Sequence, residues 1–99
     1  MKIDEYLKIG EAAKRINIHE QTIRDYERRG LIKIKRSKNN TRLFSAADLL
    51  KIEIIITLTQ ELGLNLAGVK VIFALQRELD MNDEEILDFI TDNMSEFRV

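Results

Sequence analysis

The segment that most constrains how this chain can fold is residues 18–30, which is typical of one short helix with defined ends. His19 takes the position of a helix N-cap, and Ile18 and Ile23 fall where a hydrophobic staple spans the first turn. Gly30 supplies a left-handed stop. Helical spacing gives a common surface to a polar and cationic set: Gln21, Arg24, Arg28 and Arg29. Such a surface is most often simply solvated, so the neighbouring segments decide its meaning.

A second amphipathic helix is predicted directly before this segment. Its apolar residues fall at i, i+3, i+4 and i+7, and they are Ile9, Ala12, Ala13 and Ile16. The two alanines are small enough to let another helix approach closely. Asn17 ends the first helix, so only a tight turn separates the pair. Two short helices joined in this way are typical of a helix-turn-helix, in which the second helix is the recognition helix that enters the DNA major groove.

Residues 31–44 predict a basic β-hairpin after the helix pair. Residues 31–35 alternate in part between apolar and polar side chains, and residues 41–44 return as a second strand after a polar stretch. Asparagine tolerates positive φ, so Asn39 and Asn40 can make the tight connection. The ribbon carries no acid and five cations, which are Lys33, Lys35, Arg36, Lys38 and Arg42. A cationic ribbon that projects beside a helix-turn-helix is a wing.

The second half of the chain is predicted to form further helices. Ser45 and Asp48 resemble a capping box at the start of one, and Gly63 ends it, although β-branched residues crowd its middle. Asn65 caps the next helix. Asn82 opens the last one, whose apolar face consists of Ile86, Phe89, Ile90, Met94 and Phe97.

The apolar face of that last helix has two explanations. It can fold back over its own domain and shield Val71 and Leu75, or it can pack against the same helix of a second chain in a two-fold contact. We expect the second, because an inverted-repeat DNA site requires two DNA-binding helices at a fixed separation, and a two-fold dimer would hold them so. The expected organisation is a DNA-binding domain over residues 1–79, followed at residues 80–99 by an element that dimerises or folds back.

Charge is divided unequally along the chain. Residues 1–44 hold 12 Lys+Arg against 6 Asp+Glu, whereas residues 45–99 hold 4 against 11. A basic half favours polyanions through counterion release, and an acidic half suits protein contacts or solubility. The net charge of −1 is therefore compatible with nucleic-acid binding.

The composition argues against several other classes of protein. With no cysteine and one histidine, we expect no disulfide, no metal site and no cofactor. The acids at residues 80–88 lack the glycine and spacing of a calcium loop, and the four glycines are too scattered to cradle phosphate, so we do not expect an enzyme. Without a bilayer-length apolar run or a signal-peptide core, we expect a cytoplasmic protein.

Three stretches of the chain also resemble a known family. They are IGEAAKRI at residues 9–16, HEQTIRDYERRGLI at 19–32 and KRSKNNTRLFS at 35–45. Together they are similar to the winged DNA-binding domain of MerR-type transcription regulators over about residues 6–79. Within that family, QTIRDYERRGL with ELGLNLAGVK at 61–70 is most similar to the HspR-type repressors of chaperone genes, with the GlnR group a near rival.

The resemblance implies DNA contacts for four residues, which are Thr22, Arg24, Tyr26 and Arg42. Charge and helical spacing add five more, which are Gln21, Arg28, Lys35, Arg36 and Lys38. Three positions depart from the family pattern, namely Asp25, Ile34 and Asn40. Asp25 matters most, because phosphates repel an acid. It either accepts from a cytosine amino group or pairs with Arg28 or Arg29.

The sequence therefore predicts a mainly α-helical chain with a small β-hairpin, a winged helix-turn-helix DNA-binding domain followed by two C-terminal helices. We expect a repressor of chaperone or stress genes that binds an inverted-repeat operator as a homodimer. The resemblance also implies a chaperone co-repressor of the DnaK type, since the cysteines and ligand domain of effector-sensing members are lacking. The alternative is an adaptor that binds a chaperone or co-chaperone instead of DNA; Asp25 and the acidic second half suit it, and the basic wing argues against it.

Overall fold

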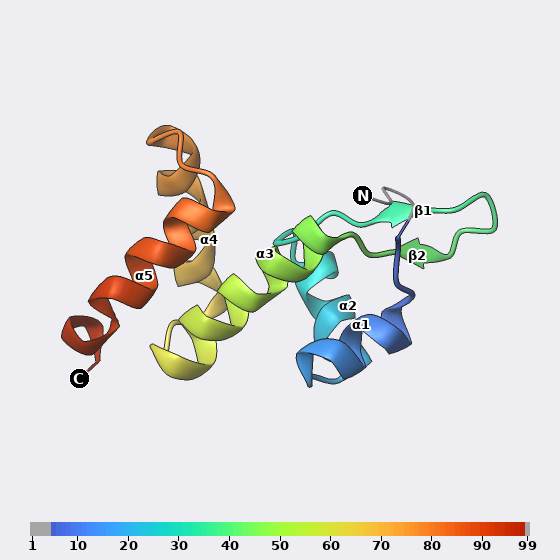
Figure 1. The fold of residues 1–99 in the computed structure, drawn as a ribbon, viewed down its shortest axis with the longest axis horizontal. Helices are drawn as coiled ribbons and strands as arrows, with labels where there is room; N and C mark the ends of the chain where they lie inside the picture. Colours follow the sequence, from blue (N-terminus) through green and yellow to red (C-terminus); the bar gives the residue numbers. More distant parts are fainter. Residues whose placement is uncertain (1–4, 99) are drawn as a thin grey trace. The chain divides into compact units, whose positions relative to one another are not determined.

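A computed structural model of the protein describes residues 5–98, and Figure 1 shows the order of its elements. They are α1 (Ile9–Ile16), α2 (Glu20–Arg28), β1 (Lys35–Arg36), β2 (Arg42–Leu43), α3 (Ala46–Ile56), η1 (Thr57–Glu61), α4 (Leu66–Glu78) and α5 (Asp83–Phe97). The chain divides into two compact units, Met1–Ile52 and Glu53–Val99, with the boundary inside α3. Helices with one small antiparallel hairpin confirm the predicted fold class.

The first unit contains the predicted helix pair, α1 and α2. Asn17 ends α1 in the left-handed conformation, with φ +63°, and Gly30 follows α2 with φ +78°. Ala12 and Ala13 are buried, which is consistent with the close approach expected of small side chains. His19 occupies the N-cap position as predicted, but within residues 5–98 its side chain makes no capping hydrogen bond. The imidazole is a poorer cap than the short oxygen-bearing side chains that favour this position.

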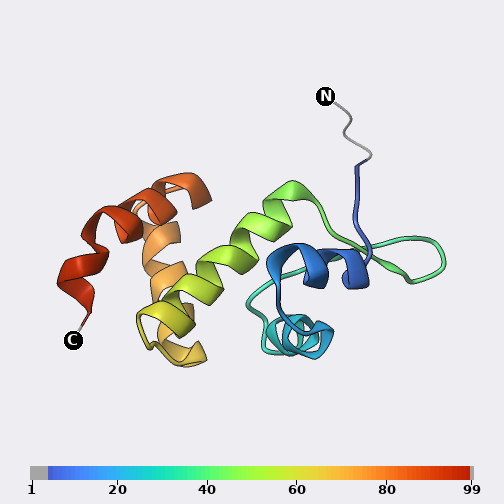
Figure 2. The ribbon, with the colours of Figure 1, turned by 60° about the horizontal axis from the view of Figure 1, so that its bottom comes forward.

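The hairpin is present but shorter than predicted. In β1 and β2, Lys35 lies opposite Leu43 and Arg36 lies opposite Arg42. The prediction that the first strand begins at residue 31 is wrong, because residues 31–34 do not pair with the second strand. They pack into the core instead, with the buried side chains Leu31, Ile32 and Ile34. In Figures 1 and 2 the loop of the hairpin extends beyond α1 and α2, as expected of a wing.

The turn of the wing and the segment before α1 are both tied by hydrogen bonds. Asn40 adopts the left-handed conformation predicted for the connection, with φ +63°. Ser37 Oγ accepts from the backbone N–H of Thr41 at 3.1 Å. Leu7 and Phe44 exchange backbone hydrogen bonds of 2.9 and 2.7 Å, so the described lead-in residues pair with the chain that leaves the wing.

The helix predicted to run from Ser45 to Gly63 is regular only in its first part. Ser45 and Asp48 form the expected capping box at its start, with reciprocal bonds of 2.8 and 3.1 Å. After α3 the chain winds into the π-helical turn η1, which corrects the prediction of one continuous helix. The hydroxyls of Thr57 and Thr59 bond back to backbone carbonyls at this point, a competing interaction that bends helices.

The second unit continues through α4 and α5, whose caps are as predicted. Asn65 Oδ1 accepts from the N–H of Gly68, and Asn82 with Glu85 forms a capping box. The amide of Gln76, only 6% exposed, donates to Asp83 Oδ1 at 2.7 Å and so ties α4 to the start of α5. Across residues 5–98, none of the helices combines the length and apolar character required to span a membrane.

Candidate nucleic-acid interface

α2 presents most of the predicted recognition residues to solvent. Gln21 and Arg28 are exposed, whereas Thr22 and Arg24 are partly covered. Gln21, Arg24 and Arg28 are three or four residues apart, so they share one side of the helix. This side contains the polar and cationic groups that hydrogen bonding to base edges or phosphates requires.

Ion pairs along α2 orient these side chains. Arg24 Nη2 lies 3.1 Å from Glu20 Oε1, and Arg28 Nη2 lies 2.7 Å from Asp25 Oδ1. Gln21 also donates to Asp25 at 3.1 Å. The hydrogen bond from Gln21 and the charge of Arg28 lower the pKa of the Asp25 carboxyl, so it is ionised at neutral pH. Of the two roles open to Asp25, the structure contains the pairing with Arg28.

Tyr26 lies on the opposite side of α2 from this surface. It is only 5% exposed and belongs to the core of the first unit with Ala12, Ile23 and Phe44. Any contact between Tyr26 and DNA would therefore involve only the small part of the residue that remains accessible.

The wing presents its cations in two different ways. Lys35, Arg36 and Lys38 are exposed, and the ammonium of Lys35 lies 5.3 Å from the centre of the Tyr6 ring, a cation–π distance. Arg42, in contrast, is partly buried. The predicted wing residues thus share one hairpin but differ in how freely they meet solvent.

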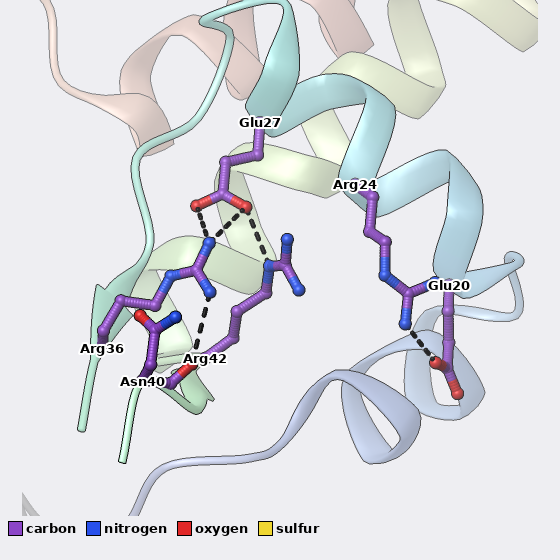
Figure 3. A network of polar contacts seen from close by, with 6 residues as sticks. All are labelled: Glu20, Arg24, Glu27, Arg36, Asn40 and Arg42. Atoms are coloured by element: carbon purple, nitrogen blue, oxygen red, sulfur yellow. Dashed lines mark hydrogen bonds and ion pairs between the residues drawn. The ribbon is translucent and has the colours of Figure 1, made fainter. Parts of the chain in front are cut away.

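A carboxylate on α2 binds two of these wing cations. Arg42 Nε donates to Glu27 Oε1 at 2.8 Å, and Arg36 Nη2 lies 3.3 Å from both oxygens of the same carboxylate. Figure 3 shows both guanidinium groups directed to the Glu27 carboxylate, with the Arg24–Glu20 pair apart from them. We refer to Glu27, Arg36 and Arg42 as the Glu27 cluster. It joins the helix to both strands of the wing.

The Glu27 cluster is partly shielded from water. The Glu27 side chain is 19% exposed and that of Arg42 is 23% exposed. Burial acts to raise the pKa of Glu27, but the hydrogen bonds and charges of Arg42 and Arg36 outweigh it and lower the pKa below its ordinary value. The carboxylate is therefore ionised at neutral pH and paired with two positive charges.

Glu27 was not among the residues predicted from sequence. The available signal was an acid that interrupts the cationic end of α2, directly before Arg28 and Arg29 and ahead of a wing without acids. An acid on a surface that is to bind phosphates would repel them unless a cation neutralised its charge. The wing supplies two such cations, Arg36 and Arg42.

The face of α5 expected to meet a second chain is divided by the packing of the second unit. Ile86 and Ile90 are buried within the single chain, whereas Phe89 and Phe97 are exposed and Met94 is intermediate. The shielding of Val71 and Leu75, which belongs to the fold-back alternative, is not observed, because both are more than half exposed. The exposed large apolar residues of this unit are Val71, Leu75, Leu79, Phe89 and Phe97.

Two apolar hollows adjoin the exposed Phe89 ring. Their volumes are about 250 and 270 Å³, and both are lined by Ile72, Ile86 and Phe89. The rings of Phe89 and Phe97 lie 6.0 Å apart, centre to centre. The second unit therefore carries open apolar surface beside its own core.

Comparison with known proteins connects these features to one family. A family model described as MerR HTH family regulatory protein matches residues 7–76. The HTH-type transcriptional regulator YfmP of Bacillus subtilis is 36% identical over 84% of this chain and 60% of its own length. HspR of Streptomyces coelicolor, named a heat shock protein, is 37% identical over 72% of this chain and 47% of its own length. The chain thus spans about half to three-fifths of these relatives.

A solved structure shows the same fold. It is the structure of HiNmlR, described as a MerR family regulator lacking the sensor domain, bound to promoter DNA. The two chains superpose with a TM-score of 0.72 at 25% sequence identity, covering 93% of this chain and 69% of HiNmlR. The resemblance inferred from the sequence motifs is confirmed by these matches, and HspR is among the similar proteins.

Proposed function

The chain belongs to the MerR HTH family of regulatory proteins, and on that premise we propose that it is a sequence-specific DNA-binding transcription regulator. The observation that carries the proposal is the span of the family match. Residues 7–76 include α1, α2 and the wing, which are all the elements that bear the predicted DNA contacts. The DNA-bound state described for HiNmlR supports the same function.

The proposed interface combines one side of α2 with the wing. Gln21, Thr22 and Arg24 lie in the N-terminal part of the helix, where side chains of a recognition helix meet base edges in the major groove. The remaining proposed contacts are Tyr26, Arg28, Lys35, Arg36, Lys38 and Arg42. Phosphates attract the five cations of this list, and such contacts set register and affinity rather than sequence preference. Tyr26 is uncharged, and only the 5% of it that remains exposed can take part.

We further propose that the protein represses chaperone or stress genes. Its similarity to HspR, whose name refers to heat shock, supports this choice of genes. A chaperone of the DnaK type is the proposed co-repressor. Because the proposed partner is DNA, we expect the protein in the cytoplasm.

A homodimer is the proposed form that meets the operator. The exposed apolar residues of α4 and α5 support it, since several of them line apolar hollows, and exposed apolar surface favours contacts between proteins. A two-fold dimer would present two copies of α2 to an inverted repeat. Residues 1–79 then serve as the DNA-binding domain and residues 80–99 as the dimerisation element.

Fluorescence anisotropy with labelled duplexes tests the proposal. The protein should bind random-sequence duplex with an affinity that falls steeply with salt, because several phosphates are neutralised. Sequences enriched from a random library should then converge on an inverted repeat. An adaptor that binds a chaperone in place of DNA would show no salt-dependent binding and no enrichment, and that result would refute the proposal.

A further inference from the structure

The wing of this protein contains two like charges at directly opposed positions. Arg36 on β1 and Arg42 on β2 are partners in the strand register. Like charges directly opposite each other destabilise a strand pair. The pairing is only two residues long, so it offers few ladder hydrogen bonds to offset that repulsion. Another interaction must compensate for it.

Glu27 provides this compensation from outside the hairpin. Its carboxylate accepts from Arg42 at 2.8 Å and from Arg36 at 3.3 Å, so one negative charge is shared by the two positive ones. Both bonds are charge-assisted, and the shorter is the stronger. Since Glu27 belongs to α2, the same bonds that stabilise the wing also tie it to the helix.

The two arginines use different nitrogen atoms in these contacts. Arg36 engages both terminal nitrogens, Nη2 with Glu27 and Nη1 with the carbonyl oxygen of Asn40 at 3.4 Å. Arg42 engages Nε, and within residues 5–98 its Nη1 and Nη2 have no hydrogen-bond partner. In Figure 3 the dashed line from Arg42 to the carboxylate starts at Nε, and none is drawn from its two Nη atoms. Arg42 therefore keeps both terminal nitrogens for a phosphate, whereas both terminal nitrogens of Arg36 are already engaged in part.

We propose that Glu27 is a positioning residue for DNA recognition, which holds the wing against α2, occupies Arg36 and orients Arg42 toward the DNA backbone. This inference rests on the proposed function and deepens it. Glu27 does not itself bind DNA, because the phosphates would repel its ionised carboxylate. Its effect is to limit the number of wing charges available to any polyanion while it keeps the geometry that a specific site requires.

The first experiment measures the wing without DNA. In Glu27→Gln, amide hydrogen exchange at Ser37 and Thr41 should accelerate by a factor of roughly 5, the effect of losing an ion pair of ordinary strength. Glu61→Gln is the matched control, because it removes a carboxylate paired with Arg98 in the second unit. Equal exchange in the two variants would overturn the inference that Glu27 holds the wing.

The second experiment measures how duplex binding depends on salt. Glu27→Gln should release Arg36 to a phosphate, steepen the slope of log affinity against log salt by about 1, and lower the ratio of specific to random affinity. Glu27 keeps Arg36 from the phosphate contact proposed above for it, so Arg36→Gln alone should leave the slope unchanged, and the double variant should restore the wild-type slope. A wild-type slope in Glu27→Gln would overturn the inference.

The two experiments separate this inference from the proposed function. A wild-type protein without salt-dependent duplex binding refutes DNA binding, and the role of Glu27 in DNA recognition fails with it. In that case the amide-exchange experiment, which uses no DNA, still tests whether Glu27 holds the wing. Salt-dependent binding that is identical in Glu27→Gln and Glu61→Gln refutes the inference while it leaves the proposed function intact.

Discussion

Arg24 Nη2 lies 3.1 Å from Glu20 Oε1, one turn earlier on the solvent side of α2, so the arginine proposed to read a base is held by a carboxylate of its own helix. Both side chains are more than one-third exposed, so the pair contributes little stability. Its main effect is to restrict where the guanidinium points. DNA would replace Glu20 as the partner of Arg24.

Arg24→Ala should therefore lower specific affinity by roughly 1–3 kcal/mol, the contribution of a bidentate base contact, and affect random DNA less. Anisotropy titrations on operator and random duplexes measure both values. Arg77→Ala, an exposed arginine of α4, is the matched loss of charge outside the interface. Equal losses on the two duplexes would exclude a base-reading role.

Arg42→Ala should weaken binding to specific and random DNA to a similar extent and reduce the salt slope by about 1, because one phosphate contact is lost. The measurement is affinity over a range of salt concentrations. Lys70→Ala, which removes an exposed cation from α4, should leave the slope at its wild-type value. An unchanged slope in Arg42→Ala would assign that arginine to the Glu27 cluster alone.

Acid should weaken the attachment of the wing to α2. The pKa of Glu27 is lowered in the folded chain from an ordinary value of 4.5, so its stabilising effect is complete above that value. The effect is lost as pH falls through the lowered pKa of the folded state. Urea unfolding of wild type and Glu27→Gln should differ by roughly 1 kcal/mol at pH 7 and converge in acid. A difference that does not change with pH would contradict an ionic role.

The oligomeric state should respond differently to two neighbouring substitutions in α5. Phe89 is 52% exposed, so Phe89→Glu should give a folded monomer that binds the operator weakly. Ile90 is 3% exposed, so Ile90→Glu should unfold the second unit, because a carboxylate would be buried without a partner. Sedimentation and circular dichroism separate these outcomes, with the exposed Asp92→Ala as a neutral control. A wild type that is monomeric at micromolar concentration without DNA would refute the dimer.

Features of this protein that depend on neighbours along the chain were predictable from the sequence. Asn17 and Gly30 end their helices, and Asn82 with Glu85 opens α5, because caps and left-handed stops involve residues only a few positions apart. The helix pair and wing followed from periodicity and charge in the same way. The family resemblance followed from motifs within these segments.

Other features were decided only by the tertiary structure. The bonds from Glu27 to Arg36 and Arg42 connect residues 9 and 15 positions apart in different elements, and helical or strand periodicity contains no record of such pairs. The apolar face of α5 was evident in the sequence, but the burial of Ile90 and the exposure of Phe89 depend on which side chains of the unit cover it. Local spacing determines which face of an element is apolar or charged, whereas its partner is chosen by packing between distant segments.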